Sequence, residues 1–472
     1  NREKELVFLA THDALTGLPN RTLILDRIEQ TLTRARHNQE PVAALFVDLD
    51  NFKAINDSLG HTTGDELLCA VARRLGGVIR ETDALGRLGG DEFVVVADGL
   101  SLAAGPELIA ERLLEAFNEP FCLGEDRETR VRAKASIGIA TGVRASAEEL
   151  LRDADIAMYR AKWGGKSRYL VFESGMEDEV QSRLETEMDL QGALGNGEFF
   201  LVYQPTFDLT TMTPTGVEAL LRWRRPGRGV IQPEEFIPLL EETKMIVDVG
   251  AWVLTEACRE AAKWQQEGRP IGLSVNVSAL QLDTDALLDH VVEALEASGL
   301  AAELLTVEIT ETTLMSNATE TARRLNELKA LGVKIAVDDF GTGYSSLAHL
   351  RQFPVDELKI DRSFVSQLAD EGGEGEILLH TLVQLGKALE IETTAEGIER
   401  PQDLSLIREK DCDSGQGFLF TRPLSAQDAG SFFSQWPADR RFEIRHGQED
   451  GDRVAINGSL GPDAAAAGAD AR

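Results

Sequence analysis

The chain has 472 residues, 43% of them hydrophobic, so it is long enough for two or three globular domains with cores of ordinary size. Its 48 basic and 80 acidic residues give a formal net charge of −32. This charge argues against a nucleic-acid or anionic-membrane surface, because both require a cationic face. An anionic substrate would therefore need bound metal ions or local arginines.

The cysteines, the lack of long apolar runs and the first residue indicate in which compartment the chain is expected. Cys69, Cys122, Cys258 and Cys412 form no CxxC pair, so we expect neither a disulfide framework nor a zinc site, and a reducing cytoplasm fits best. No apolar run approaches the ~20 residues of a membrane span, and no signal peptide is visible, so we expect no membrane contact from this segment. Because the chain opens on Asn1 rather than Met, there is room for an upstream sensor or membrane region.

The first half alternates helix-like and strand-like segments between two short flanking pieces. Residues 1–11 are charged and then apolar, which is typical of the end of an upstream signalling helix. Residues 12–173 are expected to form an α+β domain with a single central sheet. The pattern predicts helices at 23–36, 65–81, 105–117 and 147–163, strands at 42–50 and 131–141, and a hairpin around 86–97.

The second half has a different rhythm. In residues 174–196 the apolar side chains recur every four residues among acids, which predicts an amphipathic linker helix. Residues 197–437 contain eight strand-like runs, mostly separated by helical stretches, which are typical of an α/β (β/α)8 TIM-like barrel. These runs begin at residues 201, 216, 272, 305, 334, 357, 392 and 415. Residues 438–472 lack periodicity and bulky side chains, so we expect a disordered tail.

Polar side chains stand near the ends of these eight runs, where barrel enzymes carry their chemistry. One acid at such a place is more often a helix cap or a surface residue, but so many together indicate a site. Oxygen donors without His or Cys favour Mg²⁺ or Mn²⁺ over zinc. The set is Gln204, Glu218, Asn276, Glu308, Asp338, Asp339, Lys359, Glu396 and Gln416.

Adjacent acids add a constraint. Neighbours on a strand face opposite ways, so Asp338 and Asp339 reach one site only if the strand stops and the backbone turns, as the following FGTGYSS allows. Two carboxylates ~4 Å apart repel by about 4 kcal/mol at a dielectric of 20, so we expect cations beside them. A two-metal site would answer this need and suit phosphoryl chemistry. Lys359 would then orient the attacking water, or else serve as an ion-pair partner of the acids.

Arginines lie near the same site, and acids also gather in the first half. LLRWRRPGRG places four arginines at the barrel rim, either as a phosphate clamp or as a solvated loop. Asp48 and Asp50 lie two apart on a strand and hence on one face. Asn56 and Asp65 have the groups that read a guanine edge, although turn and cap roles also explain them.

The motifs of the second half resemble, in order, those of the EAL-domain cyclic di-GMP phosphodiesterases. They are EALLRW, NVS, EITE, DDFGTGYSSL, LKIDRSF, AEGIE and GQGFLF. The resemblance implies a barrel with one antiparallel strand that hydrolyses cyclic di-GMP to pGpG, with two Mg²⁺ or Mn²⁺ ions. It implies metal ligands at Glu218, Asn276, Glu308, Asp338 and Asp339, with Glu396 and Gln416 completing the metal and water shell. Lys359 would act on the water, Gln204 and Arg222 would bind substrate, and Glu311 would anchor the regulatory loop of Gly341 and Gly343.

The motifs of the first half resemble those of the GGDEF diguanylate cyclase domain. They are HDALTGLPNR, DLDNFKAIND, GHTTGDELL, RLGGDEF, SIGIA and ADIAMYRAK. The resemblance implies Mg²⁺ bound by Asp48 and Asp91 with support from Glu92, guanine read by Asn56 and Asp65, and GTP phosphates placed beside Gly89, Gly90 and Lys162. Lys166 stands where Arg is usual and lacks its bidentate fork, which predicts a less efficient cyclase. Arg80 and Asp83 match the inhibitory RxxD site, or else form a surface ion pair.

The sequence therefore predicts an enzyme of bacterial cyclic di-GMP turnover whose partners are GTP, cyclic di-GMP and pGpG. Each GGDEF domain holds one GTP, so joining two requires two domains face to face and a homodimer is expected. One alternative is a phosphodiesterase whose GGDEF domain binds GTP only as a regulatory module. An unrelated metal-dependent barrel enzyme of the enolase type would lack both DDFGTGYSSL and the attached first domain.

Overall fold

The computed structural model describes residues 8–38, 40–124, 128–341, 350–367 and 374–436. The chain divides into two compact units, Asn1–Glu185 and Thr186–Arg472. The helix expected at 1–11 is described only from residue 8, where it is helical, and the tail expected at 438–472 lies outside the described residues. Across the described ranges, no helix is long and apolar enough to cross a membrane.

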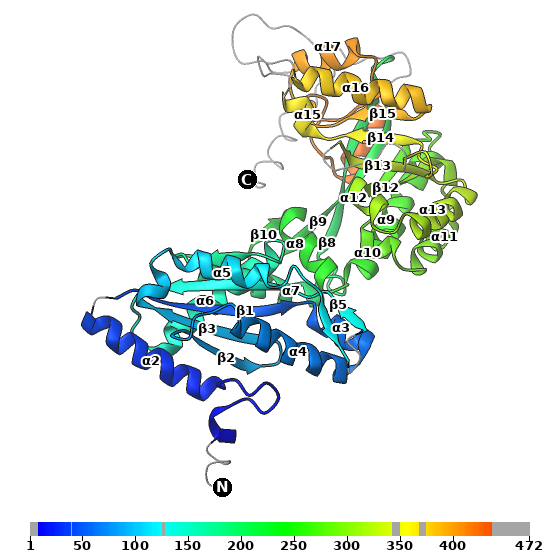
Figure 1. Cartoon of the computed structure of the whole chain (residues 1–472). Helices are drawn as coiled ribbons and strands as arrows, with labels where there is room; N and C mark the ends of the chain where they lie inside the picture. The colour runs from blue at the N-terminus through cyan, green and yellow to red at the C-terminus, as the bar shows by residue number, and fades with distance from the viewer. Residues whose placement is uncertain (1–7, 39, 125–127, 342–349, 368–373, 437–472) are drawn as a thin grey trace, which may run out of the picture. The chain divides into compact units, whose positions relative to one another are not determined.

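The first unit contains one central sheet, as predicted (Figure 1). Strand β1 pairs antiparallel with β3 on one side and β6 on the other. The order across the sheet is β2 (Ala84–Gly89), β3 (Glu92–Asp98), β1 (Val42–Asp50), β6 (Lys134–Thr141) and β7 (Tyr169–Val171). All nine residues of β1 are buried, which explains why its sequence is almost continuously apolar until the two acids near its end.

Helices cover both faces of this sheet. Alternate residues of β1 pack in two separate hydrophobic clusters, one on each face. Helices α4 (His61–Gly76) and α5 (Pro106–Glu115) cover one face, and α2 (Arg21–Asn38) and α6 (Ala147–Trp163) cover the other. Several short elements were not predicted, because they are too brief for a periodic signal. They include α3 (Phe52–Leu59), the hairpin β4 (Phe121–Leu123) with β5 (Thr129–Val131), and β7.

A glycine sets the distance between β6 and α6. A Cβ on Gly138 would lie 2.0 Å from the Ala154 carbonyl oxygen and 2.0 Å from the Met158 backbone nitrogen. We therefore expect Gly138→Ala to lower the free energy of unfolding of the first unit by about 3 kcal/mol or more, because backbone cannot yield as a side chain can. Urea unfolding of the full chain, followed by hydrogen exchange in peptides of the first unit, measures the change.

The control for this substitution is Gly76→Ala. A Cβ there would meet no atom closer than the Leu85 methyl group at 3.9 Å. Because alanine is the better helix former, this variant should be as stable as the wild type or slightly more stable. Equal stability of both variants would show that α6 does not approach β6 as closely as the structure has it.

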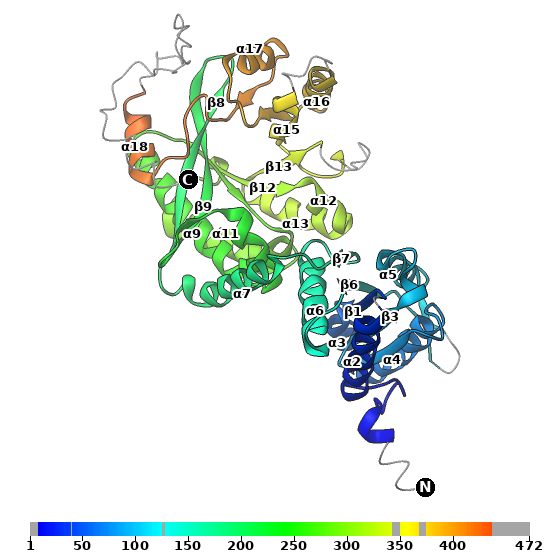
Figure 2. The same cartoon turned by 90° about the vertical axis from the view of Figure 1, so that its left-hand side faces the viewer.

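The second unit is a closed barrel of eight strands, as the sequence predicted (Figure 2). The long strand β8 runs antiparallel to both its neighbours, β9 and β16, and the other neighbouring barrel strands are parallel. The barrel strands are β8 (Phe199–Asp208), β9 (Thr213–Arg225), β11 (Gly272–Asn276), β12 (Leu305–Thr310), β13 (Lys334–Phe340), β14 (Glu357–Ile360), β15 (Glu392–Ala395) and β16 (Ser414–Gly415).

Helices surround the barrel, and one more helix leads into it. Helix α7 (Met176–Ala193) covers the segment in which the linker helix was expected. A short strand, β10 (Gly229–Ile231), extends the sheet beyond β9. The helices around the barrel include α8 (Pro233–Glu242), α9 (Ile246–Gln266), α10 (Ala279–Leu282), α11 (Ala286–Ser298), α12 (Glu311–Ser316), α13 (Ala318–Ala330), α15 (Arg362–Ser366), α16 (Glu374–Leu389), α17 (Pro401–Glu409) and α18 (Ala426–Ser434).

The last predicted strand is much shorter than the sequence suggested. GQGFLF has the composition of a strand, but β16 ends at Gly415. A Cβ on Gly417 would lie 2.2 Å from the Ile398 carbonyl oxygen, so the chain there passes directly against another backbone segment. Leu419 and Phe420 are nevertheless buried, which explains their apolar character without a strand.

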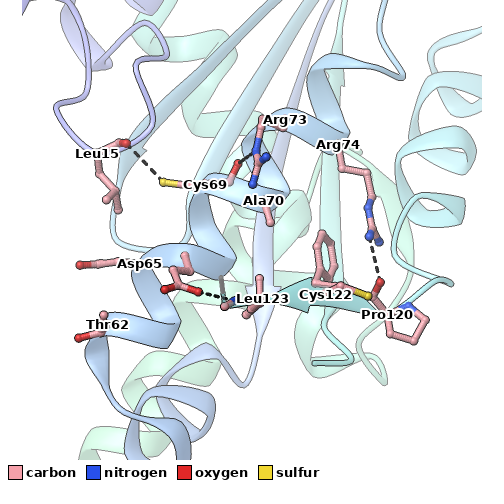
Figure 3. A pocket seen from close by; sticks show the side chains of 13 residues that line it. Leu15, Thr62, Asp65, Cys69, Ala70, Arg73, Arg74, Pro120, Cys122 and Leu123 are labelled. Carbon is pink, nitrogen blue, oxygen red and sulfur yellow. Dashed lines mark hydrogen bonds between the residues drawn. The ribbon is translucent and has the colours of Figure 1, made fainter. Parts of the chain in front are cut away.

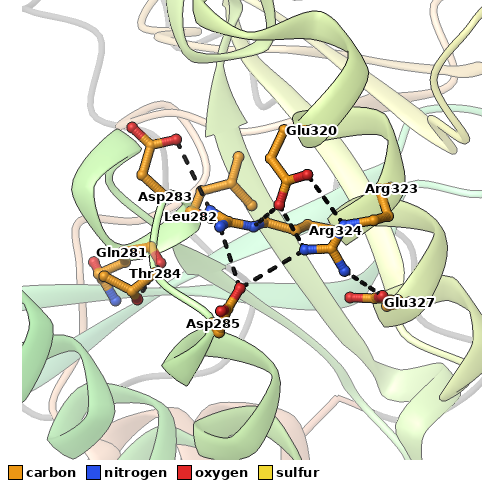
Figure 4. A network of polar contacts seen from close by, with 9 residues as sticks. All are labelled: Gln281, Leu282, Asp283, Thr284, Asp285, Glu320, Arg323, Arg324 and Glu327. Atoms are coloured by element: carbon orange, nitrogen blue, oxygen red, sulfur yellow. Dashed lines mark hydrogen bonds and ion pairs between the residues drawn. The ribbon is translucent and has the colours of Figure 1, made fainter.

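A polar network braces the outside of the barrel between α13 and the start of α11 (Figure 4). The Arg324 guanidinium contacts Glu320 Oε1 at 2.9 Å and Asp285 Oδ1 at 3.2 Å. Arg323 pairs at 2.5 Å with both Glu320 and Glu327. Several of these side chains are substantially exposed, and exposed ion pairs contribute little to stability, so we expect this network to have only a small effect on the free energy of unfolding.

Candidate active sites

One lysine lies where the barrel carboxylates converge. Lys359, on β14, is 2% exposed. Its Nζ lies 2.7 Å from both Glu308 and Glu396, 3.2 Å from Glu218 and 3.8 Å from Asp338. Glu218, Glu308 and Asp338 lie within β9, β12 and β13, and Glu396 directly follows β15. The parallel arrangement of these strands brings the four acids together. The single ammonium of Lys359 therefore lies within 4 Å of four carboxylates, so negative charge is in excess when these acids are ionised.

Glu218 receives two further hydrogen bonds. Asn276 Nδ2 donates to its Oε1 at 2.6 Å, and Gln416 Nε2 donates to its Oε2 at 2.8 Å. The Gln416 amide also lies 3.2 Å from Gln204 Oε1, and Gln204 is the cross-strand partner of Glu218 between β8 and β9. The structure thus gathers four of the predicted residues around one carboxylate.

The protonation of the barrel acids follows from burial and from this excess of negative charge. Burial raises the pKa of Glu396 to about 8, against the opposing attraction of Lys359. Burial also raises the pKa of Glu308 well above its usual value, although Lys359 opposes it. Glu218 is the exception: burial would raise its pKa, but Lys359 and the hydrogen bonds from Gln416 and Asn276 hold it below the ordinary value. The same carboxylates hold the pKa of Lys359 well above its usual value, although burial alone would lower it.

A bulge in β13 directs the side chains of Asp338 and Asp339 to the same site, whereas we had expected the end of the strand to do so. The pairing of β13 with β14 shifts register between Val337 and Phe340, and Asp339 has a left-handed φ of 53°. This conformation breaks the alternation of faces that would have sent the two side chains apart. Burial and repulsion from Asp338 raise the pKa of Asp339. Most of the turn sequence thought to end the strand lies outside the described residues.

The donor chemistry of this cluster fits hard divalent cations. Carboxylate and amide oxygens are the groups that Mg²⁺ and Mn²⁺ prefer. Within the described ranges, no three Asp, Glu, His or Cys side chains are arranged to hold a metal ion. In the barrel, the Lys359 ammonium lies among the carboxylates. Repulsion among Glu308, Glu218 and Asp338 is what a cation would relieve.

The arginines at the rim separate into different roles. Arg222 is half-buried beside Glu218 and Glu234, and burial lowers its pKa. Arg224 stacks over the Phe200 ring at 4.7 Å. Arg225 is buried, and its guanidinium binds Asp189. The prediction that all four arginines bind one substrate phosphate is therefore wrong for Arg225. Side chains alternate along β9, so Arg225 lies on the face opposite Arg222.

The predicted loop anchor is visible in part. Glu311 is buried, and its Oε2 accepts a hydrogen bond from the Gly341 backbone N–H at 2.8 Å. Gly341 has a φ of 100°, a conformation that favours glycine. Gly343 lies outside the described residues.

In the first unit, the predicted acids gather at the end of β1. Asp48 Oδ1 lies 2.6 Å from Lys162 Nζ, and Glu92 is the cross-strand partner of Asp48. Burial raises the pKa of Asp48 to about 6, with repulsion from Asp91 and Glu92 adding to this and Lys162 opposing it. Asp50 has a structural role, because it accepts hydrogen bonds from Ser136 Oγ and the Ser167 backbone N–H.

The glycines of the hairpin are explained by backbone conformation and open space. Gly89 and Gly90 have φ values of 153° and 50°, and no atom lies within 4 Å of where either Cβ would be. Arg87 holds the turn: its guanidinium donates to the Gly90 carbonyl at 2.6 and 3.0 Å and to Asp13 Oδ1 at 2.8 Å. Arg87 therefore holds the turn in place on one side, and the space beside Gly89 and Gly90 is open on the other side. A backbone that binds phosphate requires such open space.

Asn56, on α3, packs against Gly64 of α4, and Asp65 is the next residue along α4. A Cβ on Gly64 would lie 1.8 Å from Asn56 Oδ1, so this glycine makes room for the amide. Oδ1 of Asn56 is buried and accepts no hydrogen bond from the described residues. Asp65 also lines a pocket of about 930 Å³ between α4 and the β4–β5 hairpin (Figure 3). A buried acceptor that has no donor among the described residues, together with the Asp65 carboxylate, would suit the N–H groups of a purine edge.

Two further predictions have a structural counterpart. Lys166 donates to Asn51 Oδ1 at 3.0 Å from the turn after α6. Asp83 accepts a hydrogen bond from the Arg80 backbone N–H at 3.0 Å, and both residues line a small cavity with Arg112.

The sequence reasoning missed Asp155 and Arg87. Burial raises the pKa of Asp155, and Asp155 in turn raises the pKa of Glu92, so it belongs to the same acidic cluster. It lies inside ADIAMYRAK, where an acid among alanines on a helix that packs on the sheet was the available signal. Arg87 stands next to the glycines in RLGGDEF, but its contact with Asp13 links residues 74 positions apart.

Known proteins match both units. The diguanylate cyclase, GGDEF domain model matches residues 10–168, and the EAL domain model matches residues 187–423. The bifunctional diguanylate cyclase/cyclic di-GMP phosphodiesterase MucR of Pseudomonas aeruginosa is 42% identical over 425 residues, which cover 90% of this chain and 62% of that protein. The cyclic di-GMP phosphodiesterase NbdA of the same organism is 38% identical over 438 residues, which cover 93% and 56%.

One solved structure, "PaMucR Phosphodiesterase, c-di-GMP complex", matches with a TM-score of 0.51 at 41% identity. The match covers 52% of this chain and 99% of that one. The chain spans about half to two thirds of the length of the curated relatives named above.

Proposed function

The chain belongs to the family of tandem GGDEF and EAL proteins, and from this premise we propose that its EAL domain hydrolyses cyclic di-GMP to pGpG. Phosphodiesterases are among the relatives of this domain. The observation that carries the proposal is the convergence of Glu218, Glu308, Asp338 and Glu396 on the buried Lys359. Such a cluster is tolerated where cations and a phosphodiester share its charge.

In this proposal each residue has a defined task. Glu218, Asn276, Glu308, Asp338 and Asp339 would hold two Mg²⁺ or Mn²⁺ ions. Bound ions of this kind supply an activated water and neutralise phosphoryl charge.

Other side chains position and charge the reacting groups. Lys359 orients the water and keeps Glu308 and Glu396 in place, as its 2.7 Å contacts with both allow. Gln416 and Asn276 fix the Glu218 carboxylate by hydrogen bonds. Arg222 binds a phosphate of the substrate, which its position beside Glu218 supports.

For the first unit we propose that two GGDEF domains of a homodimer condense two GTP molecules to cyclic di-GMP. Asp48 and Asp91 would bind Mg²⁺ with support from Glu92 and Asp155, and Lys162 would contact phosphate. Asn56 and Asp65 would read guanine, which the unsatisfied Oδ1 of Asn56 supports. Arg80 and Asp83 would bind the product as an inhibitor. The alternative is a domain that binds GTP without turnover and regulates hydrolysis.

The test is to incubate the full chain separately with cyclic di-GMP and with GTP in Mg²⁺ and to follow nucleotide products over time. We expect pGpG from the first and cyclic di-GMP from the second. If GTP yields no product but changes the rate of pGpG formation, the regulatory alternative holds. A folded protein that leaves cyclic di-GMP intact would refute the phosphodiesterase proposal.

Removal of metal gives a separate prediction. We expect EDTA to abolish hydrolysis and Mg²⁺ or Mn²⁺ in excess to restore it, because without ions nothing neutralises the developing phosphoryl charge. Addition of Mg²⁺ to the metal-free chain should also raise its melting temperature, since an ion that binds only the folded state stabilises it. Calorimetry of the chelated and the reloaded protein measures this shift. If EDTA changes neither the rate of hydrolysis nor the melting temperature, the two-metal assignment is contradicted.

A further inference from the structure

A buried arginine joins the end of α7 to the end of β9. Arg225 is 4% exposed and is the last residue of β9. Its Nε and Nη2 both lie 2.7 Å from Asp189 Oδ2, and its Nη1 donates to Thr186 Oγ1 at 2.9 Å. Asp189 and Thr186 lie in the last two turns of α7. We call Arg225, Asp189 and Thr186 the α7 clamp.

The same end of β9 is held at a second point. Trp223 Nε1 donates to Glu198 Oε2 at 2.9 Å, and the Arg224 backbone N–H donates to the Glu198 carbonyl at 2.8 Å. The Trp223 ring is fully buried and packs against Phe199. The segment that follows α7 is therefore fixed to β9 by hydrogen bonds and by an aromatic contact, and the clamp extends this attachment to the helix itself.

Strand β9 also carries residues of the proposed catalytic site. Arg222 lies three residues before Arg225, and Glu218 lies seven residues before it. Glu218 is tied to β11 through Asn276, whereas among the described residues the Arg222 guanidinium donates a hydrogen bond only to the carbonyl of its neighbour Leu221. The position of Arg222 thus depends on where the end of the strand lies. A misplacement of about 1 Å in a substrate-binding group can cost up to a hundredfold in rate.

We propose that Arg225 is a positioning residue for the phosphodiesterase reaction: the α7 clamp fixes the end of β9 so that Arg222 meets a substrate phosphate. The inference rests on the proposed function of the EAL domain. Because the acid of the clamp lies on α7, displacement of this helix would leave the buried Arg225 unpaired, and an unpaired buried charge is unfavourable. The end of the linker helix therefore sets substrate affinity.

The test compares four variants of the full 472-residue chain. Arg225→Met and Asp189→Ala break the clamp and should each raise KM for cyclic di-GMP by roughly tenfold while kcat changes by less than about threefold. Asp189→Glu keeps the acid and should restore a KM near that of the wild type. Hydrogen exchange of the unliganded protein should be faster in peptides covering 220–225 for the first two variants only.

The fourth variant, Arg144→Met, is the matched control. It breaks an Arg–Asp pair, Arg144 with Asp153 at 2.6 Å, that lies in the first unit. Its KM for cyclic di-GMP should equal that of the wild type. Wild-type KM in both Arg225→Met and Asp189→Ala, or a defect in Asp189→Ala that Asp189→Glu shares, would overturn the inference.

The design also separates this inference from the function on which it rests. If Arg225→Met does not fold, the KM of Asp189→Ala still tests the inference, because this variant changes a half-exposed residue. If the wild type itself does not hydrolyse cyclic di-GMP, the proposed function fails. In that case unchanged exchange in the 220–225 peptides would refute the clamp independently.

Discussion

Glu218→Ala is expected to reduce kcat/KM for cyclic di-GMP by roughly a thousandfold or more, because the proposed metal site would lose a ligand and with it several kcal/mol of charge stabilisation, at about 1.4 kcal/mol per factor of ten. Glu218 combines three contacts: Lys359 at 3.2 Å and the amides of Asn276 and Gln416 at 2.6 and 2.8 Å. Lys359 retains Glu308 and Glu396 at 2.7 Å in the variant, so the barrel should still fold. The measurement is the initial rate of pGpG formation in saturating Mg²⁺.

Two controls accompany this variant. Glu392→Ala removes an exposed acid from the opposite end of a barrel strand, β15, and should leave the rate within about twofold. Synthesis of cyclic di-GMP from GTP should continue in Glu218→Ala, because the first unit has its own acids. Hydrolysis at the wild-type rate in folded Glu218→Ala would mean that the cluster around Lys359 is not the catalytic site.

The barrel could be predicted from the sequence because it contains eight apolar strand-like runs, mostly separated by helical stretches. Polar residues also stand in or directly after these runs, and the barrel brings several of them together around Lys359. The predicted strand GQGFLF was wrong in its length: β16 ends at Gly415, and Leu419 and Phe420 are buried beyond that end without belonging to a strand. Alternation cannot reveal a bulge such as the one at Asp339, since the bulge is defined by pairing with the next strand.

The sites were predictable to the extent that their residues lie within motifs. Asp48, Glu92 and Lys162 meet in the structure, as do Glu218, Asn276, Gln416 and Lys359. Contacts between distant segments were not predictable, because nothing in the local sequence indicates the partner. The clearest case is Arg225, which looked equivalent to Arg222 but lies on the other face of β9 and binds helix α7.

Asp91→Ala is expected to reduce the rate of cyclic di-GMP synthesis by roughly a thousandfold while leaving hydrolysis unchanged. Asp91 lies directly after Gly90 in the hairpin turn, and repulsion from Asp91 and Glu92 contributes to the raised pKa of Asp48. Its loss removes one of the two acids that would hold Mg²⁺ against the phosphates of GTP, and several kcal/mol of charge stabilisation disappear with it. The hairpin should persist, because Arg87 still binds the Gly90 carbonyl. The measurement is the rate of cyclic di-GMP formation from GTP in the Glu218→Ala background, where the product is not consumed.

The matched control is Asp98→Ala at the other end of β3, where Asp98 forms a surface ion pair with Arg34 at 3.1 Å. It should synthesise cyclic di-GMP at the wild-type rate, since exposed ion pairs contribute little. Unchanged synthesis in Asp91→Ala would refute the assignment of the first site. If neither the wild type nor Asp91→Ala forms cyclic di-GMP, but GTP alters hydrolysis by the wild type and not by Asp91→Ala, the same acid would act in binding alone. The arrangement of Asp48, Asp91 and Lys162 is compatible both with synthesis and with binding alone. In the proposed reaction, a domain that holds GTP and Mg²⁺ forms cyclic di-GMP only when a second domain presents another GTP to it.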